Sequence, residues 1–412
     1  MGLNVPKLQT AADALLASAT STGDHSTLVP GIVAIVTDAS GDVYTGAAGV
    51  RTLGEAEPMT LDSTFCLFST TKAIAAVCAM QLVEEGLLDL DKPAADYVPA
   101  IGDVKLFTGW TDDGQPILVK PKNTITPRML LTHTAGFSYE FSEPDVYGRL
   151  CRDHGYPTIA SGKLEYIQRF PILFEPGTRW QYGINMDWMG LVIEAIRGMR
   201  LDDVMKKYVF EPLDMRSITF EMTPAMAAKR VSIHWRDPET SALAADPAFQ
   251  LKQGAELETH NGGHGLYGTV ADYTKFIRMF LNDGVSDTGK RVLKKETIDW
   301  AWEDQIPTTP INGLVSYDPT LVQKFDTPTE PAPRFGWACS FMKLLEDAPS
   351  GRPAGSVNWA GLANLFYFID RKNKVGAYWA TQMFPFWDPY AYGGYDKLEN
   401  IIYDALETEV AA

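Results

Sequence analysis

Alternating and continuous runs of apolar residues predict strand hairpins at both ends of the chain. Near the N-terminus, the apolar and β-branched run 31–38 is followed by the polar turn 39–42 and a second strand-like run, VYTGAAGV. Near the C-terminus, the polar turn 371–374 joins two more runs into a second hairpin. The strand-like runs in that part of the chain are 335–344, 363–370 and 375–383. Both chain ends are therefore expected to contribute strands.

Apolar residues at helical spacing fill much of the remaining chain. A helix is expected from Ser69 to about Leu88, and Gly86 is placed to end it. Further helices are expected at 7–19, 201–210, 271–284 and roughly 395–410. Between about 90 and 330, such helical patterns alternate with loops rich in proline and glycine.

This order of elements predicts an α/β (α+β) fold. We expect residues 1–90 and 330–412 to form one domain, in which an antiparallel sheet made by both chain ends is flanked by helices. Residues 91–329 would form an inserted, mostly helical domain. A cleft between the two domains is the natural place for an active site.

The composition argues against several classes of partner. The 412 residues carry a formal net charge of −16, and an acidic surface repels nucleic acid and anionic membranes. There is no run of 18 apolar residues, and the N-terminus shows no signal-peptide pattern. The four cysteines form no Cys-x-x-Cys pair and are expected to be free thiols. These features predict a cytoplasmic protein with neither nucleic acid nor membrane as a partner.

The segment Ser69-Thr70-Thr71-Lys72 places a nucleophile and a base at the start of a predicted helix. Residues i and i+3 share a helix face, so the Lys72 amine can reach the Ser69 oxygen. The positive end of the helix and its free N–H groups would stabilise a developing oxyanion. The pattern alone is weak evidence, because Ser340-Phe341-Met342-Lys343 matches it too and Ser69 could simply cap its helix. The second match lies in a strand-like run, where i and i+3 point to opposite faces, so Ser340 is expected to be structural.

Tyr182 is a second candidate for proton transfer. The Pro-Gly pair at 176–177 forces a turn that delivers Tyr182 to the front of an apolar helix, Met189 to Ile196. A tyrosine beside a lysine can ionise transiently and relay a proton. Taken by itself, Tyr182 is more often expected to be a packed aromatic side chain.

Four segments together resemble class C β-lactamases and their relatives. They are LFSTTK (67–72) followed by QLVEEGLLDLD, ITPRMLLTHTAG (125–136), EPGTRWQY (175–182) and GGHGLYGT (262–269). They follow the order of that family over about residues 30–385. The resemblance implies the fold predicted above and a covalent acyl-enzyme on Ser69. It also implies that His264 lies at the cleft. His133 is expected to form structural hydrogen bonds rather than to act as the base, because Lys72 and Tyr182 fill that role.

Two departures from the family pattern change the expected substrate. The family β-lactamases have Tyr-x-Asn, whereas Ile184 holds the Asn position here and Asn185 comes one residue late. The resemblance also calls for Lys-Thr-Gly on a late strand, where this chain has Trp359-Ala360-Gly361. An indole cannot replace that positive charge but can stack on an uncharged apolar group. Similar replacements occur in β-lactamase-like carboxylesterases and in the lovastatin-type fungal acyltransferase, which favours an ester or thioester over a lactam.

The resulting hypothesis is a serine esterase that acts on neutral carboxylic esters or thioesters. Ser69 attacks the acyl carbonyl, Lys72 and Tyr182 accept and relay its proton, and the N–H groups of Ser69 and Leu362 bind the oxyanion. The residues expected to bind substrate are Trp359, Gly361, Ile184 and His264. No cofactor and no metal is expected, because the two histidines of HNGGH (260–264) lie in a glycine-rich loop. The expected partner is a small-molecule acyl ester, with an acceptor alcohol in a transfer reaction.

Three alternatives remain open at this stage. An acyltransferase that acylates a natural-product alcohol shares the same first half-reaction. A β-lactamase or D-amino-acid peptidase is disfavoured by Trp359 and Ile184. A catalytically silent binding scaffold would not require Ser69, Lys72 and Tyr182 together. The sequence specifies neither the acyl chain, nor the leaving group, nor the oligomeric state.

Overall fold

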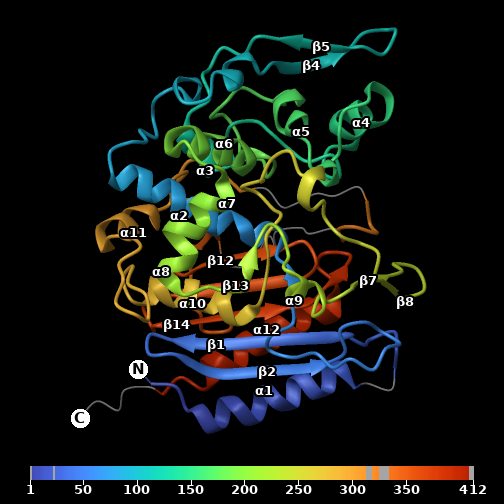
Figure 1. Cartoon of the computed structure of the whole chain (residues 1–412), viewed down its shortest axis with the longest axis vertical. Coiled ribbons are helices and arrows are strands. Elements are labelled where there is room, and N and C mark those ends of the chain that lie inside the picture. The colour runs from blue at the N-terminus through green and yellow to red at the C-terminus, as the bar shows by residue number, and fades with distance from the viewer. Residues whose placement is uncertain (1, 22–23, 312–317, 324–333, 408–412) are drawn as a thin grey trace.

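The computed structural model describes residues 2–21, 24–311, 318–323 and 334–407. Its central element is a seven-stranded antiparallel sheet in the order β10-β11-β12-β13-β14-β1-β2. Figure 1 shows β12, β13, β14, β1 and β2 one below the other in this order. The strands are β1 (Gly31–Asp38), β2 (Asp42–Gly49), β10 (Phe335–Trp337), β11 (Met342–Leu344), β12 (Val357–Gly361), β13 (Leu365–Asp370) and β14 (Val375–Ala380). The expected mixed fold, with an antiparallel sheet built from both chain ends, is confirmed.

Strand β1 joins the two ends of the chain and separates two hydrophobic cores. Ile35 pairs with Tyr378 of β14 on one side and with Thr45 of β2 on the other. Because side chains alternate along a strand, Ile32 enters the core under α1 and α12, whereas Val33 enters the larger core on the opposite face. On that opposite face, α10 lies against β1 and β14. These helices are α1 (Val5–Thr20), α10 (Val270–Leu281) and α12 (Pro389–Asp404).

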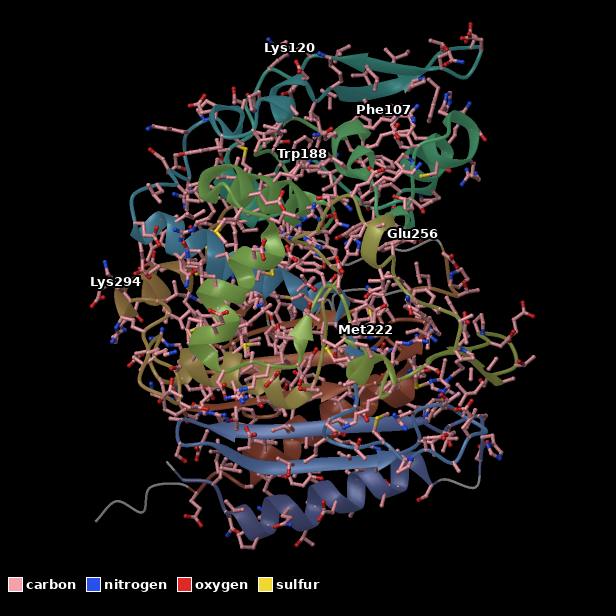
Figure 2. The ribbon with its side chains drawn as sticks, in the orientation of Figure 1. Phe107, Lys120, Trp188, Met222, Glu256 and Lys294 are labelled. Atoms are coloured by element: carbon pink, nitrogen blue, oxygen red, sulfur yellow. The ribbon has the colours of Figure 1, made fainter. Side chains whose placement is uncertain are left out.

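Most other helices gather beyond the β12 side of the sheet (Figure 1). They are α2 (Thr71–Glu84), α3 (Pro127–Leu131), α4 (Arg149–His154), α5 (Leu164–Arg169), α6 (Asn185–Arg197), α7 (Leu201–Met205) and α11 (Lys295–Ala301). Two short helices, α8 (Glu211–Leu213) and α9 (Pro224–Ala227), instead lie at the level of the sheet. Figure 2 labels Trp188 of α6, which is fully buried in the helical part, and Lys120, which is exposed beside the outermost hairpin. That hairpin consists of β4 (Leu106–Trp110) and β5 (Pro116–Val119).

Two small sheets tie distant segments together near the junction of the two parts. In the first, β9 (Tyr267–Gly268) pairs with both β3 (Phe65–Cys66) and β6 (Ile218–Thr219). In the second, β7 (Ile233–Arg236) pairs with β8 (Leu243–Asp246) and β15 (Met383–Phe384). The first sheet matters most for function, because β3 leads directly into Ser69 and β9 follows the glycine-rich segment 262–265.

Two helices cross the expected division at residue 90. Residues 71–82 of α2 are all buried, and α2 packs against α6 and α7 of the helical part. Conversely, α10 comes from the segment 91–329 but packs on the sheet. A helix that is apolar on all sides must be covered by other elements on all sides. α2 is therefore packed among the helices, against α6 and α7, rather than lying on a face of the sheet.

Two of the expected elements differ in the structure. The expected strand 335–344 is two short strands, because Ser340 adopts a left-handed backbone (φ 62°) and the Ala338 N–H donates to Phe341 O at 2.8 Å. The last helix begins at Pro389, earlier than expected, because Asp388 caps it and Pro389 occupies its first turn. It ends at Asp404, and residues 408–410 of the expected helix lie outside the described residues. No helix within the described ranges is long and apolar enough to cross a membrane.

Candidate active site

Ser69 lies in a 3₁₀ turn, η1 (Phe68–Thr70), immediately before α2. The turn is held by the Leu67 N–H, which donates to Leu266 O at 2.8 Å, and by Phe68, whose backbone is left-handed (φ 45°). A non-glycine residue in that conformation stores backbone strain, which structures tolerate mainly where position matters for function. Ser69 is partly exposed, so its hydroxyl is held at a helix start and remains accessible.

Lys72 is fully buried and aims its amine at Ser69. Its Nζ lies 3.1 Å from Ser69 Oγ, 2.9 Å from Tyr139 Oη and 2.8 Å from the Gly263 carbonyl oxygen. The ammonium can donate one N–H to each of these oxygens. The neutral amine can keep two of these bonds, to Tyr139 and Gly263, and accept the Ser69 proton with its lone pair. One geometry therefore satisfies both protonation states.

Burial makes Lys72 a base near neutral pH. Removal from water lowers the Lys72 pKa to about 7, and the negative charge of Asp187 opposes that shift. Asp187 is itself fully buried in α6, and burial raises its pKa while Lys72 and the Gly263 N–H lower it. The Gly263 N–H donates to Asp187 Oδ1 at 2.7 Å. A side chain at position 263 would meet that oxygen at 2.7 Å, so glycine is required there.

Tyr182 lies beside both members of the Ser69–Lys72 pair. Its hydroxyl hydrogen-bonds to Ser69, and the Lys72 Nζ lies 4.6 Å from the centre of its ring. The indole Nε1 of Trp359 donates to Tyr182 Oη at 3.1 Å. Burial raises the Tyr182 pKa, whereas the hydrogen bonds from Ser69 and Trp359 lower it. Trp359 thus stands where the family resemblance calls for a lysine, and it contacts the tyrosine directly.

The end of β12 approaches the backbone that precedes Ser69. A side chain at Gly361 would lie 2.7 Å from the Leu67 carbonyl oxygen, so only glycine permits this approach. β12 packs against η1, and Leu362 lines the same cavity as Ser69. The two N–H groups expected to bind an oxyanion, those of Ser69 and Leu362, therefore belong to adjoining segments at one cavity.

A cavity of about 550 Å³ opens at these residues. Of the expected site residues, Ser69, Tyr182, His264, Trp359, Gly361 and Leu362 line it, and Lys72 lies behind Ser69. Many of the other side chains that line the cavity are apolar: Phe68, Phe141, Ile159, Phe249, Leu251, Leu321, Val322, Phe384 and Phe386. The space is thus shaped for an apolar group next to a polar reaction centre.

His264 lines the cavity as a neutral side chain. Burial and the charge of Lys72 lower its pKa to about 3, and its Nε2 lies 3.2 Å from Asn261 Nδ2. His133 is fully buried and its Nδ1 lies 2.9 Å from Asn185 Nδ2. Burial holds the pKa of His133 well below its usual value, so this imidazole is a structural hydrogen-bonding group.

The structure does not bring Ile184 to the cavity, in contrast to the expectation that it binds substrate. Ile184 precedes the first residue of α6 and is fully buried in the core, and it is not among the lining residues. Asn185, one residue later, turns toward His133 instead of Lys72. The one-residue offset relative to Tyr-x-Asn therefore removes the amide from the reaction centre.

Sequence reasoning missed Tyr139 and Asp187. Tyr139 follows the ITPRMLLTHTAG segment by only three residues, and the family resemblance of that segment is the one signal that could have drawn attention to it. Asp187 is the only acid between Tyr182 and Ile193, and an acid inside an apolar helix start indicates a buried partner charge. Neither residue has a spacing relationship to Lys72 that the sequence alone could reveal.

The described residues contain no group of three or more His, Cys, Asp or Glu side chains that could hold a metal ion. The four cysteines are free; three are buried and Cys151 is partly buried. Burial raises the pKa of the Cys66 thiol to about 12. These thiols are therefore unreactive packing groups.

An antiparallel sheet flanked by helices on both faces is the fold of the β-lactamase and penicillin-binding-protein type. The profile of the family described as Beta-lactamase matches residues 16–395, and the chain belongs to this family. Within the family it is a serine hydrolase of the carboxylesterase or acyltransferase kind.

Three relatives illustrate that placement. A lovastatin esterase of Penicillium rubens is 32% identical over 86% of this chain and 89% of its own length. An ML-236A carboxylate methylbutanoyltransferase of Penicillium citrinum is 29% identical over 92% of this chain and 91% of its own length. Among solved structures, the LovD6 mutant of simvastatin synthase from Aspergillus terreus superposes with a TM-score of 0.79 and 25% identity, covering 96% of this chain and 94% of that chain.

Proposed function

We propose that this enzyme cleaves a carboxylic ester through an acyl-enzyme on Ser69 and passes the acyl group to water. The observation that carries the proposal is the contact of Lys72 Nζ with Ser69 Oγ at 3.1 Å, beside an apolar cavity. Burial lowers the pKa of this amine to about 7, so its neutral form is accessible near neutral pH and can accept the serine proton.

The acylation step follows from this geometry. Ser69 Oγ attacks the ester carbonyl carbon while its proton passes to Lys72 Nζ. The carbonyl oxygen becomes an oxyanion, which the N–H groups of Ser69 and Leu362 bind. As the intermediate collapses, the C–O bond to the alcohol breaks, and Tyr182 relays a proton to the departing oxygen. Water then attacks the acyl-enzyme by the same steps in reverse.

Trp359 supports an ester rather than a β-lactam as substrate. Its indole occupies the place at which the family resemblance calls for a lysine, and donates to Tyr182 instead of presenting a charge to the cavity. The indole N–H favours the ionised form of Tyr182 without attracting a carboxylate near the scissile bond. The group that lies next to Ser69 is therefore expected to be uncharged and apolar.

The first test is intact mass spectrometry after brief incubation with p-nitrophenyl butyrate, with nitrophenol release followed in parallel. The wild-type protein should gain one butyryl group and turn over, whereas Ser69→Ala should do neither. Ser340→Ala is the matched control, because it removes the serine of the second Ser-x-x-Lys sequence, and it should behave as wild type. A butyryl adduct that survives in Ser69→Ala would show that another residue is the nucleophile.

Acyl transfer to an alcohol is the second candidate. The relative named as a methylbutanoyltransferase aligns over nearly the whole chain, and a cavity of about 550 Å³ can hold more than a small acyl group. The two reactions share the acylation step and differ in what attacks the acyl-enzyme. The two reactions are distinguished by measuring how much new ester and how much free acid form when a nucleophilic alcohol is present in water. More ester than acid at millimolar alcohol identifies a transferase.

A further inference from the structure

The cavity that begins at Ser69 has a second end, where charged side chains lie among the aromatic rings of Phe366, Tyr392 and Tyr395. Beyond Ala360 and Leu362 it extends to the face of the sheet that α12 covers, where Arg352, Ser350 and Glu399 line it. Arg352 and Ser350 lie in the connection between β11 and β12, and Glu399 lies on α12. This end lies outside the reaction centre described above and contains none of its catalytic groups.

Arg352 is the unusual residue at this end. Its side chain is only 8% exposed, yet within the described ranges its Nε and Nη1 have no hydrogen-bond acceptor. The Glu399 Oε1 lies 3.4 Å from Nε, close enough for an ion pair but without hydrogen-bond alignment. The two Glu399 oxygens already accept from Ser350 Oγ at 2.5 Å and from Tyr395 Oη at 3.2 Å. Glu399 is thus fixed by other donors and leaves the guanidinium under-bonded.

A buried guanidinium with unused N–H groups costs free energy unless an acceptor arrives. The missing partner is an acceptor of several N–H bonds, and a carboxylate presents two oxygens that match the guanidinium fork. Two acids flank the site, Glu399 and Asp396. Glu399 offsets the Arg352 charge, and burial followed by the Glu399 charge raises the pKa of Asp396, which reduces its competition with an incoming anion.

We propose that Arg352 binds a carboxylate carried by the substrate at the end remote from the scissile ester. The inference rests on the proposed function and deepens it: the ester bond next to Ser69 is neutral, whereas the substrate as a whole is a carboxylic acid. Apolar side chains line the cavity near Ser69, and Arg352 supplies the fixed point at the other end. Such a two-point arrangement selects substrates by length as well as by charge.

The binding test does not depend on catalysis. Isothermal titration calorimetry with Ser69→Ala should show that monomethyl sebacate binds at least about tenfold more tightly than dimethyl sebacate, the size expected of a charge-assisted hydrogen bond. Arg352→Gln/Glu399→Gln, added to Ser69→Ala, should abolish that preference; the paired change leaves no buried charge alone. Arg197→Gln/Glu85→Gln removes a different arginine–glutamate pair outside the cavity and should leave the preference unchanged.

One single substitution should increase, rather than abolish, the binding preference for the monoacid. Glu399→Gln keeps Arg352 and removes the competing charge, so the preference for the monoacid should increase. A purely structural ion pair would give no such gain. Equal binding of the two sebacates, or a preference that survives Arg352→Gln/Glu399→Gln, would overturn the proposal. Because these measurements use a protein without Ser69, their failure is distinct from a failure of p-nitrophenyl butyrate hydrolysis, which tests the proposed function.

Discussion

The chain contains the pattern Ser-x-x-Lys twice, and the structure gives the two copies opposite surroundings. Ser69 and Lys72 span the start of α2, and the helical backbone brings Nζ within 3.1 Å of Oγ. Ser340 lies in the tight turn between β10 and β11, where its N–H donates to Leu131 O, and Lys343 follows on β11. The same four-residue spacing therefore produces a contact only where the backbone is helical.

Burial separates the two lysines further. Lys72 has no exposed surface, and all three of its amine contacts are with protein oxygens. Lys343 is partly exposed on a short strand near the sheet edge. Burial lowers the pKa of Lys72 to about 7. The two copies therefore differ in both helix geometry and burial, and we expect a reactive Ser-x-x-Lys to need both.

The largest effect should come from Lys72→Met compared with Lys343→Met. Loss of the Lys72 amine removes the base, so kcat/KM for p-nitrophenyl butyrate should fall about 10³-fold, whereas Lys343→Met should stay near wild type. Methionine has a similar volume, but it leaves Tyr139 Oη and the Gly263 oxygen without their donor, so the thermal midpoint is measured beside kcat/KM to show that the variant is folded. Equal losses of kcat/KM in the two variants would show that Lys72 has no special role compared with Lys343.

The next largest effect should separate the two tyrosines at Lys72. Tyr182 hydrogen-bonds to Ser69, whereas Tyr139 Oη accepts a hydrogen bond from Lys72 Nζ. Tyr182→Phe should therefore lose the proton relay and reduce kcat about 10²-fold, whereas Tyr139→Phe should lose about tenfold by loosening the amine. The measurement is steady-state hydrolysis with both variants. A larger loss in Tyr139→Phe would assign the relay to Tyr139.

Much of the fold and the core of the site could be predicted from the sequence because both depend on local patterns. The apolar run of β1 and the helix that carries Lys72 follow directly from side-chain periodicity. The prediction of one continuous strand over 335–344 is wrong because Ser340 adopts a left-handed backbone. The sequence gives no sign of this, since neither glycine nor asparagine occupies that position. The predicted start of the final helix, at about residue 395, is too far along the chain. The helix starts at the capping pair Asp388-Pro389, before the apolar pattern begins.

Tertiary contacts account for what the sequence could not indicate. Tyr139 is 67 residues from Lys72 and Gly263 is 191 residues away, so no spacing rule connects them. Ile184 was expected at the cavity from its position two residues after Tyr182, but the start of α6 turns it into the core. Arg352 belongs to no recognisable sequence motif. It stands out only in the structure, where its Nε and Nη1 are buried without a hydrogen-bond acceptor.

A smaller effect should follow from Trp359→Phe. The substitution keeps an aromatic ring but removes the N–H that donates to Tyr182 Oη at 3.1 Å. Without that donor the Tyr182 pKa rises and proton relay slows, so kcat should fall about tenfold, the value of one hydrogen bond to a charge-bearing group. In the double variant Trp359→Phe/Tyr182→Phe, the loss should equal that of Tyr182→Phe alone. Additive losses would show that Trp359 acts on the substrate directly.

The smallest expected effect is a displaced pH profile. Because the neutral amine is the base, kcat/KM should rise as pH passes through about 7, the Lys72 pKa. The Asp187 charge raises that pKa, so Asp187→Asn should move the rise to lower pH, by about one unit, while Asn still accepts from the Gly263 N–H. Asp370→Asn, another buried acid outside the cavity lining, is the control and should leave the profile in place. A rise that moves to higher pH in Asp187→Asn would mean that the catalytic base is not Lys72, since removal of a negative charge can only favour a neutral amine.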